Sequence, residues 1–218
     1  MSEWSLLDVL PETERRRVVA ASRRRRFARN EVIFHEGDPG DALHLVSRGL
    51  VAIRIHTPLG DVATVRLLRP GEFFGELAII SPGPRNATAI ALDRAETLSV
   101  TRQQLEELQL QHEQITALIT EALVAEIRRL AQQVVELMYV SVEKRLWRRL
   151  RDLSIAFGSS SEPADEIPVT QEMLGQLAGC TRPTANRALR AGEVEGIITM
   201  GRGRIAVVDA AALAKRAR

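Results

Sequence analysis

The longest regular pattern of apolar and polar positions lies between Leu108 and Leu153. Apolar residues spaced four, three, four and three positions apart mark one side of a helix there: Leu123, Ile127, Leu130, Val134 and Leu137. No proline or glycine interrupts residues 108–140, so the pattern predicts one long helix. Such a stripe is typical of a helix that pairs with a second copy of itself, and burial against the chain's own core is the alternative. The length of the segment and the polar residues beside the stripe favour a dimer interface.

Short apolar segments separated by turn residues occupy the chain from Phe27 to Val100. Each of four such segments ends at a turn that contains glycine or proline: Val32–Phe34, Leu43–Val46, Val51–Ile55 and Val62–Leu68. Strands that recur about every 8–12 residues with such turns predict an antiparallel β-barrel or jelly roll, which commonly encloses one ligand. Before it, Trp4 to Arg26 predicts one or two short helices, whose arginine runs are expected to form a solvated surface.

A helix-turn-helix is expected after the long helix. Threonines suited to the N-cap precede two short helical patterns, at Thr170 and Thr181, and Gly179 supplies the turn between them. Tyr139–Glu143, where β-branched residues interrupt the leucine pattern, predicts a hinge. Phe157–Glu166 predicts a polar loop.

A hairpin is expected near the C-terminus. Apolar residues alternate in Ile197–Met200 and Ile205–Val208 around Gly201-Arg202-Gly203. Its basic tip and its place after the two helices are typical of a wing. Together the patterns predict an α+β protein with N-terminal helices and a β-barrel over residues 1–107, a long helix over 108–140 and a winged helix-turn-helix over 141–218.

Composition and charge narrow the function classes. At 218 residues and 45% hydrophobic, the chain can bury two modest cores. No apolar run approaches the roughly 20 residues that span a membrane, and no signal peptide is evident, so a cytoplasmic protein without membrane contact is expected. One cysteine and four scattered histidines offer no metal-ligand spacing, so we expect no metal site and no required cofactor. Residues 141–218 carry 13 Lys and Arg against 9 Asp and Glu, whereas residues 1–140 carry 17 against 19, which makes the C-terminal part the better candidate for binding phosphate.

Residues suited to a sugar phosphate gather between Gly71 and Ala89. Gly75 lets backbone N–H groups approach an anion, and Arg85 offers a forked cation. Glu76 has the wrong charge for phosphate but can accept a hydrogen bond from a sugar hydroxyl. The alternative is a surface turn closed by an ion pair between Glu76 and Arg85.

The segments Phe74–Ala78 and Pro84–Thr88 resemble the phosphate-binding cassette of cyclic-nucleotide-binding domains, and their place in the chain resembles the sensor of the Crp/Fnr family. The resemblance implies that Glu76 holds a ribose 2′-hydroxyl and Arg85 a cyclic phosphate. Asn86 stands where many members have Ser or Thr, and its amide can still donate to phosphate. The implied effector site comprises Gly75, Glu76, Leu77, Ala78, Arg85, Asn86 and Ala87 from the cassette and Arg129, Leu130 and Gln133 from the long helix.

Base recognition departs from the cyclic-AMP-responsive members of the family. Leu130-Ala131 stands where the resemblance implies a pair of hydroxyl side chains that contact adenine. Arg128, Arg129 or Gln133 would have to substitute for them. Cyclic AMP is the first choice of effector, and a cyclic dinucleotide or a vestigial sensor without ligand are the alternatives.

The outward face of the second helix of the helix-turn-helix is basic. Arg182 and Asn186 lie one turn apart and suit guanine and adenine edges in the major groove, whereas Arg187 and Arg190 suit phosphates or a second base. The region again resembles the Crp/Fnr head, although Pro183 replaces an acidic residue that reads cytosine in well-known members. The expected DNA contacts are Thr170, Gln171, Thr181, Arg182, Pro183, Thr184, Asn186, Arg187, Arg190, Arg202 and Arg204. A pair of helices inside an unrelated core is the alternative.

These features predict a homodimeric, effector-responsive transcription regulator on a palindromic operator. Its expected partners are double-stranded DNA, a second copy of the chain, a nucleotide effector and, as a further candidate, RNA polymerase. An enzyme that uses the Glu76–Arg85 pocket is disfavoured, because the sequence contains no nucleophile–base pair and no phosphate-binding loop. A nucleotide-binding subunit that controls another protein is disfavoured by the basic head.

Overall fold

The computed structural model describes residues 4–58, 60–158, 164 and 166–218. The chain divides into two compact units, Met1–Arg128 and Arg129–Arg218, and each is described by itself. The predicted three-part division at residues 107 and 140 stays a prediction. The polar loop expected at Phe157–Glu166 lies mostly outside the described residues.

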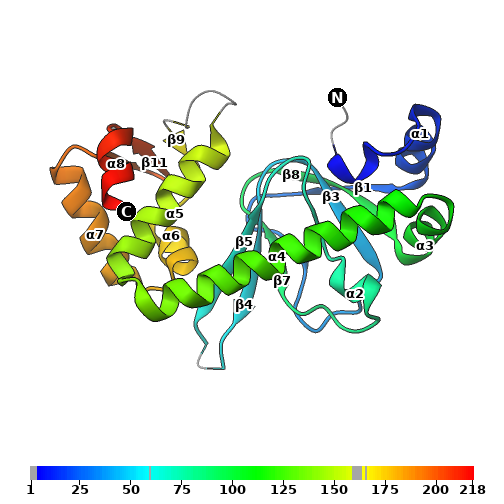
Figure 1. Ribbon diagram of the computed structural model, residues 1–218, viewed down its shortest axis with the longest axis horizontal. Coiled ribbons are helices and arrows are strands. Elements are labelled where there is room, and N and C mark those ends of the chain that lie inside the picture. Colours follow the sequence, from blue (N-terminus) through cyan, green and yellow to red (C-terminus); the bar gives the residue numbers. More distant parts are fainter. Residues whose placement is uncertain (1–3, 59, 159–163, 165) are drawn as a thin grey trace. The chain divides into compact units, whose positions relative to one another are not determined.

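Two antiparallel sheets form the body of the first unit (Figure 1). One has the order β1-β8-β3-β6 and the other the order β2-β7-β4-β5. The strands are β1 (Arg23–Phe27), β2 (Val32–Phe34), β3 (Ala42–Arg48), β4 (Val51–His56), β5 (Val62–Leu68), β6 (Phe73–Phe74), β7 (Thr88–Ala91) and β8 (Ala95–Thr101). All strand pairs are antiparallel, which confirms the predicted all-antiparallel sensor.

Apolar side chains from both sheets form the core of the first unit. One cluster includes Phe27, Val51 and Phe74 from strands of the two sheets. The other joins Leu43 and Leu98 to apolar residues of the N-terminal segment and of the helices after β8. β3 buries five successive residues, Ala42–Val46, so both of its faces are covered.

The arginine run at Arg23–Arg26 was expected to be helical, and this expectation is wrong. These residues form β1, which pairs with β8 in the register Arg26↔Glu96. Arg24 and Arg26 both bond the carboxylate of Glu96, at 2.6 and 2.9 Å. The segment is a strand because it pairs with Glu96 and its neighbours, some seventy positions away. A pattern of nearby residues cannot reveal such a partner. The helical part of the N-terminal region is η1 (Ser5–Leu7) and α1 (Glu12–Ala21).

Three helices follow the sheets. They are α3 (Arg102–Gln111), α4 (Glu113–Tyr139) and α5 (Val142–Phe157). The long helix therefore begins at Glu113 and not at Leu108, which is buried on α3. Thr101 caps α3 through a capping box with Gln104. The second unit starts inside α4, at Arg129.

The second unit is a winged helix-turn-helix. It contains α6 (Gln171–Ala178), α7 (Arg182–Val194), α8 (Ala210–Arg216) and a sheet of the order β10-β11-β9, formed by β9 (Glu166–Ile167), β10 (Ile198–Gly201) and β11 (Arg204–Val207). Trp147 of α5 is buried within this unit. A Cβ on Gly192 of α7 would lie 2.3 Å from its indole ring. α5 and α7 thus approach each other at a position where only glycine fits.

Candidate effector site and nucleic-acid interface

Arg85 lies inside the sensor and not on its surface. Its side chain donates from Nη1 to the carbonyl oxygen of Gly75 at 2.9 Å and from Nη2 to that of Ala42 at 2.6 Å, and its residue exposure is 4%. Asp41 lies 3.6 Å from Nη2, so the ion-pair partner of Arg85 is Asp41 and not Glu76. The predicted alternative, a surface turn closed by a Glu76–Arg85 pair, does not describe this geometry.

An aromatic group supports the guanidinium. The Cζ atom of Arg85 lies 4.2 Å from the centroid of the Phe34 ring, a cation–π contact. Phe34 contacts Phe74, and Phe74 stacks on His44 at 5.2 Å. Burial, helped by the charge of Arg85, lowers the pKa of His44 to about 3, so the imidazole is neutral at physiological pH. The group therefore adds no competing positive charge beside Arg85.

Glu76 stands at the start of a short helix, α2 (Leu77–Ile80), beside Gly75. Gly75 has φ +83°, and a Cβ there would lie 2.6 Å from Nη1 of Arg85, so both the turn and the close approach of Arg85 require glycine. Burial raises the pKa of Glu76; the charge of Glu126 raises it further, whereas Arg66 and Arg85 oppose the shift. The site thus places a half-buried carboxylate and a buried guanidinium next to one glycine.

Two residues that the sequence did not single out hold α2 in place. Arg102 donates to the carbonyl oxygens of Ala78 at 2.6 Å, Gly40 at 3.1 Å and Ile79 at 3.2 Å. Gly40 packs so closely on α2 that a Cβ there would lie 2.1 Å from the Cβ of Ala78. The sequence gives no sign that the arginine after the N-cap Thr101 has this role, because its partners come from a separate part of the chain.

The remaining residues of the expected cassette differ in exposure. Ala78 and Ala87 are buried, whereas Leu77 and Asn86 are exposed. Leu77 and Ala78 both lie on α2, and Asn86 and Ala87 follow Arg85 directly. Arg129, Leu130 and Gln133 lie on the part of α4 that belongs to the second unit. Their contribution to an effector site stays a prediction.

Replacing Glu76 by glutamine is expected to stabilise the ligand-free protein at pH 7. Because the pKa of Glu76 is raised, the folded protein holds this proton more tightly than the unfolded chain does, and stability falls as the pH rises above the ordinary value of 4.5. Glu76→Gln cannot ionise, so thermal unfolding at pH 7 should occur at a higher Tm, by about 2–4 °C for each kcal/mol gained. The gain should disappear below pH 4.5. A lower Tm at pH 7 would contradict a costly buried carboxylate.

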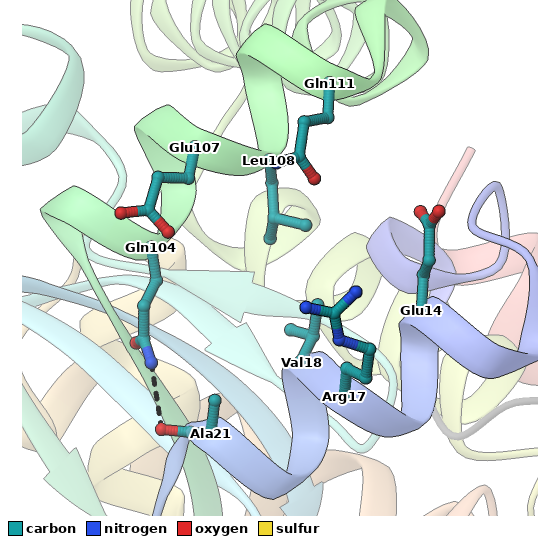
Figure 2. A pocket seen from close by; sticks show the side chains of 8 residues that line it. All are labelled: Glu14, Arg17, Val18, Ala21, Gln104, Glu107, Leu108 and Gln111. Atoms are coloured by element: carbon teal, nitrogen blue, oxygen red, sulfur yellow. Dashed lines mark hydrogen bonds between the residues drawn. The ribbon is translucent and has the colours of Figure 1, made fainter.

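A separate hollow lies between α1 and α3. Its volume is about 180 Å³, and Figure 2 shows residues of both helices lining it: Glu14, Arg17, Val18, Ala21, Gln104, Glu107, Leu108 and Gln111. Gln104 closes one end by donating to the carbonyl oxygen of Ala21 at 2.9 Å (Figure 2). None of the expected effector-site residues lines this hollow.

The apolar stripe on α4 divides into a covered and an uncovered part. Leu123 packs against the core of the first unit, as the alternative interpretation required. The later members are exposed within the single chain: Ile127 at 65%, Leu130 at 42%, Val134 at 55% and Leu137 at 56%. Val124, Val135 and Met138 are also exposed. The uncovered apolar surface is therefore wider than the predicted seam.

The helix-turn-helix is built as the sequence predicted. Thr170 accepts a hydrogen bond from the backbone N–H of Met173 and caps α6, and Gly179 ends α6 with φ +64°. The two helices pack closely, because a Cβ on Gly175 would lie 3.2 Å from the Cβ of buried Ala185. Thr181 stands at the N-cap position of α7, but its side chain makes no capping hydrogen bond, which corrects the expectation for this residue; its hydroxyl instead lies 3.0 Å from that of Thr184. Pro183 occupies the first turn of α7, where a missing N–H costs little.

A chain of side-chain hydrogen bonds links three of the residues expected to contact DNA to Met200 on the wing strand β10. Arg190 donates to Oδ1 of Asn186 at 3.1 Å, Asn186 donates to Oε1 of Gln171 at 2.8 Å, and Gln171 donates to Sδ of Met200 at 3.0 Å. Both amide atoms of Asn186 thus have a partner within the head, and its expected contact with an adenine edge stays a prediction. Gln171 joins α6, α7 and the wing strand β10.

Three of the arginines expected to contact DNA are available for binding. Arg182, Arg187 and Arg202 are exposed and have no ion-pair or hydrogen-bond partner in the part of the chain that the structure describes. Arg182 and Arg187 line one surface hollow with Pro183, Asn186 and Arg190. Arg202 lies at the tip between β10 and β11, whereas Arg204 pairs with Glu166 at 2.7 Å. Exposed guanidinium groups without partners are suited to phosphates and base edges.

Two family models match separate parts of the chain. Residues 24–112 match the cyclic nucleotide-binding domain, and residues 144–216 match the Crp-like helix-turn-helix domain. The chain is 30% identical to a "CRP-like cAMP-activated global transcriptional regulator" of Mycobacterium tuberculosis, over 88% of this chain and 87% of the relative. It is 34% identical to a "Cyclic AMP receptor protein" of Thermus thermophilus, over 87% and 86%.

A solved structure supports the fold. The c-di-GMP responsive global regulator CLP of Xanthomonas campestris superposes with a TM-score of 0.75, covering 88% of this chain and 96% of that one at 24% identity. No helix among the described residues is long and apolar enough to cross a membrane. The relatives are transcription regulators, so the chain is a DNA-binding regulator and not an enzyme. It belongs to the Crp/Fnr family of transcription regulators, with an antiparallel cyclic-nucleotide-binding domain and a C-terminal winged helix-turn-helix.

Proposed function

We propose that the protein is a homodimeric regulator that binds a palindromic operator when its sensor holds a cyclic nucleotide, with cyclic AMP as the first candidate. The observation that carries this proposal is the group formed by Gly75, Glu76 and Arg85, in which a half-buried acceptor and a buried guanidinium lie beside a backbone turn. A sugar hydroxyl and a phosphate need these two chemistries side by side. Relatives named as cAMP-activated or as a cyclic AMP receptor favour the same effector.

A cyclic dinucleotide is the second candidate effector. The solved regulator of Xanthomonas campestris is described as responsive to c-di-GMP. The Leu130-Ala131 pair of this chain lacks the hydroxyls that would read an adenine edge, which leaves base identity open to either ligand class. A vestigial sensor would leave the buried charges of the cassette without a function.

The homodimer is supported by α4. Contiguous exposed apolar side chains along a helix mark an interaction surface, and a two-fold axis along the helix would bury the same stripe from both chains. Two heads joined in this way would meet consecutive major grooves about 34 Å apart. RNA polymerase is a further candidate partner. The proposed location is the cytoplasm, because a bacterial operator lies there.

Titration of the purified protein tests the effector. Calorimetry with cyclic AMP, cyclic GMP and cyclic di-GMP in parallel is expected to give saturable binding of cyclic AMP in the micromolar range, about −8 kcal/mol. Selection of operators from a random DNA pool, with and without the bound nucleotide, should then yield a two-fold symmetric site only in its presence. Binding of cyclic di-GMP alone would select the second candidate, and binding of none of the three would contradict the proposed sensor while leaving family membership intact.

Arg182 and Arg202 are expected to affect DNA binding in different ways. Arg182→Ala should cost about 1–3 kcal/mol on the selected operator and relax its preference at one base pair in each half-site, because a guanidinium on the exposed N-terminal turn of α7 suits a base edge. Arg202→Ala should weaken binding to all sequences alike and reduce the salt slope by about one. Fluorescence anisotropy over a series of operators and salt concentrations measures both. An unchanged base preference in Arg182→Ala would exclude α7 as the reading helix.

A further inference from the structure

Arg66 of β5 is a charged residue on the face of its sheet that covers the core. It pairs directly with Ile53 of β4, and Ile53 pairs in turn with Ala89 of β7. Directly paired residues of antiparallel strands share one face of a sheet. Ala89 belongs to the core cluster of the first unit, as does Leu68, two positions after Arg66, and Ile53 packs against that cluster. A guanidinium therefore starts from an inward-facing position within a row of apolar side chains.

The strand is irregular at this position. The pairing passes from Arg66↔Ile53 directly to Thr64↔Arg54, so the register between β4 and β5 shifts beside Arg66. Irregularities of this kind bend a strand and re-aim a side chain, and they are common next to binding sites. The local backbone can therefore bring the long side chain of Arg66 out of the apolar row and towards a ligand.

One carboxylate holds part of the Arg66 guanidinium. Nη2 of Arg66 donates to Oε1 of Glu72 at 3.2 Å, and the other carboxylate oxygen of Glu72 accepts from the backbone N–H of Arg69 at 2.9 Å. The side chains of Arg66 and Glu72 are 31% and 32% exposed, and an ion pair that water reaches adds little stability. Among the described residues Glu72 is the hydrogen-bond partner of Arg66 and takes Nη2 alone. Nε and Nη1 therefore keep their N–H groups for a ligand.

The charge of Arg66 acts on the proposed effector site. Burial raises the pKa of Glu76, and among the charged side chains that act on this carboxyl group Arg66 has the largest effect, ahead of Glu126 and Arg85. The charges that act on Arg85 are those of Asp41, Glu76 and Asp38. Glu76 is therefore the group that both guanidinium groups share, and Arg66 approaches it from β5.

The chemistry of a cyclic nucleotide assigns different parts of the ligand to the two arginines. In the proposed function Arg85 meets the phosphate, which bridges the 3′ and 5′ oxygens, and Glu76 accepts from the 2′-hydroxyl. That hydroxyl is on the carbon next to C1′, which carries the base. A second cation near Glu76, on a different element from Arg85, is therefore suited to the base.

We propose that Arg66 is a base-contacting residue of the effector site, whose N–H groups meet the acceptor edge of a purine and raise the affinity for guanine relative to adenine. A guanidinium can only donate. Guanine presents two acceptors on one edge, O6 and N7, whereas adenine presents N7 beside an amino group that itself donates. A bidentate contact is therefore available to guanine alone. The inference rests on the proposed cyclic-nucleotide sensor and concerns the ratio of two affinities, whichever nucleotide binds more tightly.

Calorimetry on the full-length protein with cyclic AMP and cyclic GMP tests the role of Arg66. In Arg66→Met, of similar length but without donors, the ratio of the Kd for cyclic GMP to the Kd for cyclic AMP should rise about tenfold. Arg66→Lys keeps the charge without the planar fork and should give an intermediate ratio. The control Arg69→Met removes another arginine beside Glu72, 3.7 Å from its carboxylate and 41% exposed, and should leave the ratio unchanged. A purely structural role of Arg66 would lower the Tm or weaken both nucleotides alike.

A modified ligand tests the contact without relying on one variant. In 7-deaza-cyclic GMP a C–H group replaces the acceptor N7, so the wild-type protein should bind it several-fold more weakly than cyclic GMP. Arg66→Met should bind the two ligands equally; should this variant fail to fold, Arg66→Lys takes its place and should show a smaller difference than wild type. Equal binding of the two ligands by wild type, or an unchanged nucleotide ratio in the folded variant, would overturn the contact and leave the proposed sensor intact. Failure of wild type to bind any cyclic nucleotide would overturn both.

Discussion

Arg85→Ala is expected to weaken cyclic AMP binding by about 100-fold or more, equivalent to about 2.7 kcal/mol, and also to lower the Tm of the sensor. The first effect follows from the loss of the guanidinium that bonds the carbonyl oxygen of Gly75. The second follows because the carbonyls of Gly75 and Ala42 lose their donor while buried, at about 1–3 kcal/mol for each unsatisfied group. Arg85 is thus expected to act both as a ligand contact and as a structural residue.

Calorimetry well below the lowered Tm separates the two effects of Arg85→Ala. Arg85→Lys keeps the charge but cannot donate to two carbonyls from a planar fork, and should fall between wild type and alanine in both respects. Arg94→Ala, which removes an exposed arginine of the same domain, should alter neither. A folded Arg85→Ala protein that binds cyclic AMP as wild type does would exclude this pocket as the nucleotide site.

Val134→Glu is expected to convert the proposed dimer to a monomer and to abolish specific operator binding, a loss of about 100-fold or more. Val134 is 55% exposed in the single chain, and in a two-fold interface along α4 it would face its own copy or a close neighbour. The substitution would bury two like charges in an apolar seam without partners. A single head then contacts one half-site, and the gain from joining two half-sites disappears.

Sedimentation and anisotropy measure the two consequences of Val134→Glu. Gln132→Glu adds the same charge to an exposed polar position of α4, so it controls for charge alone and should leave both the dimer and the operator affinity unchanged. A Val134→Glu protein that sediments as a dimer would assign the exposed stripe to some other contact.

Local pattern predicted the strands whose ends are marked by turn residues. β2 and β5 span the residues expected from the sequence, because glycine and proline fix where those strands stop. β1 escaped because four successive arginines hide any period of two, and its pairing with β8 depends on distant residues. The start of α4 was misplaced because the break at His112 contains neither glycine nor proline.

The candidate sites were predicted in part. Gly75, Glu76 and Arg85 could be found as residues, since their chemistry and order are recognisable, but the burial of Arg85 on Phe34 could not. Arg102, and the buried Arg145 of α5 that bonds backbone carbonyl oxygens, were missed for a common reason. A buried arginine looks like a solvated one in sequence, because its carbonyl partners carry no side-chain signature. The exposed recognition arginines are easier to predict, since an outward position follows from helical period alone.

The chain of hydrogen bonds from Arg190 through Asn186 and Gln171 to Met200 bears on how such regulators could be re-targeted. The amide of Asn186 takes its orientation from a side chain on α6, which in turn rests on the wing. If α7 alone were transplanted into a related scaffold, the amide of Asn186 would lose the contact that orients it. We therefore expect the transferable module for operator choice to be α7 together with Gln171 and Met200, so that sequence preference would depend on three elements and not on one helix alone.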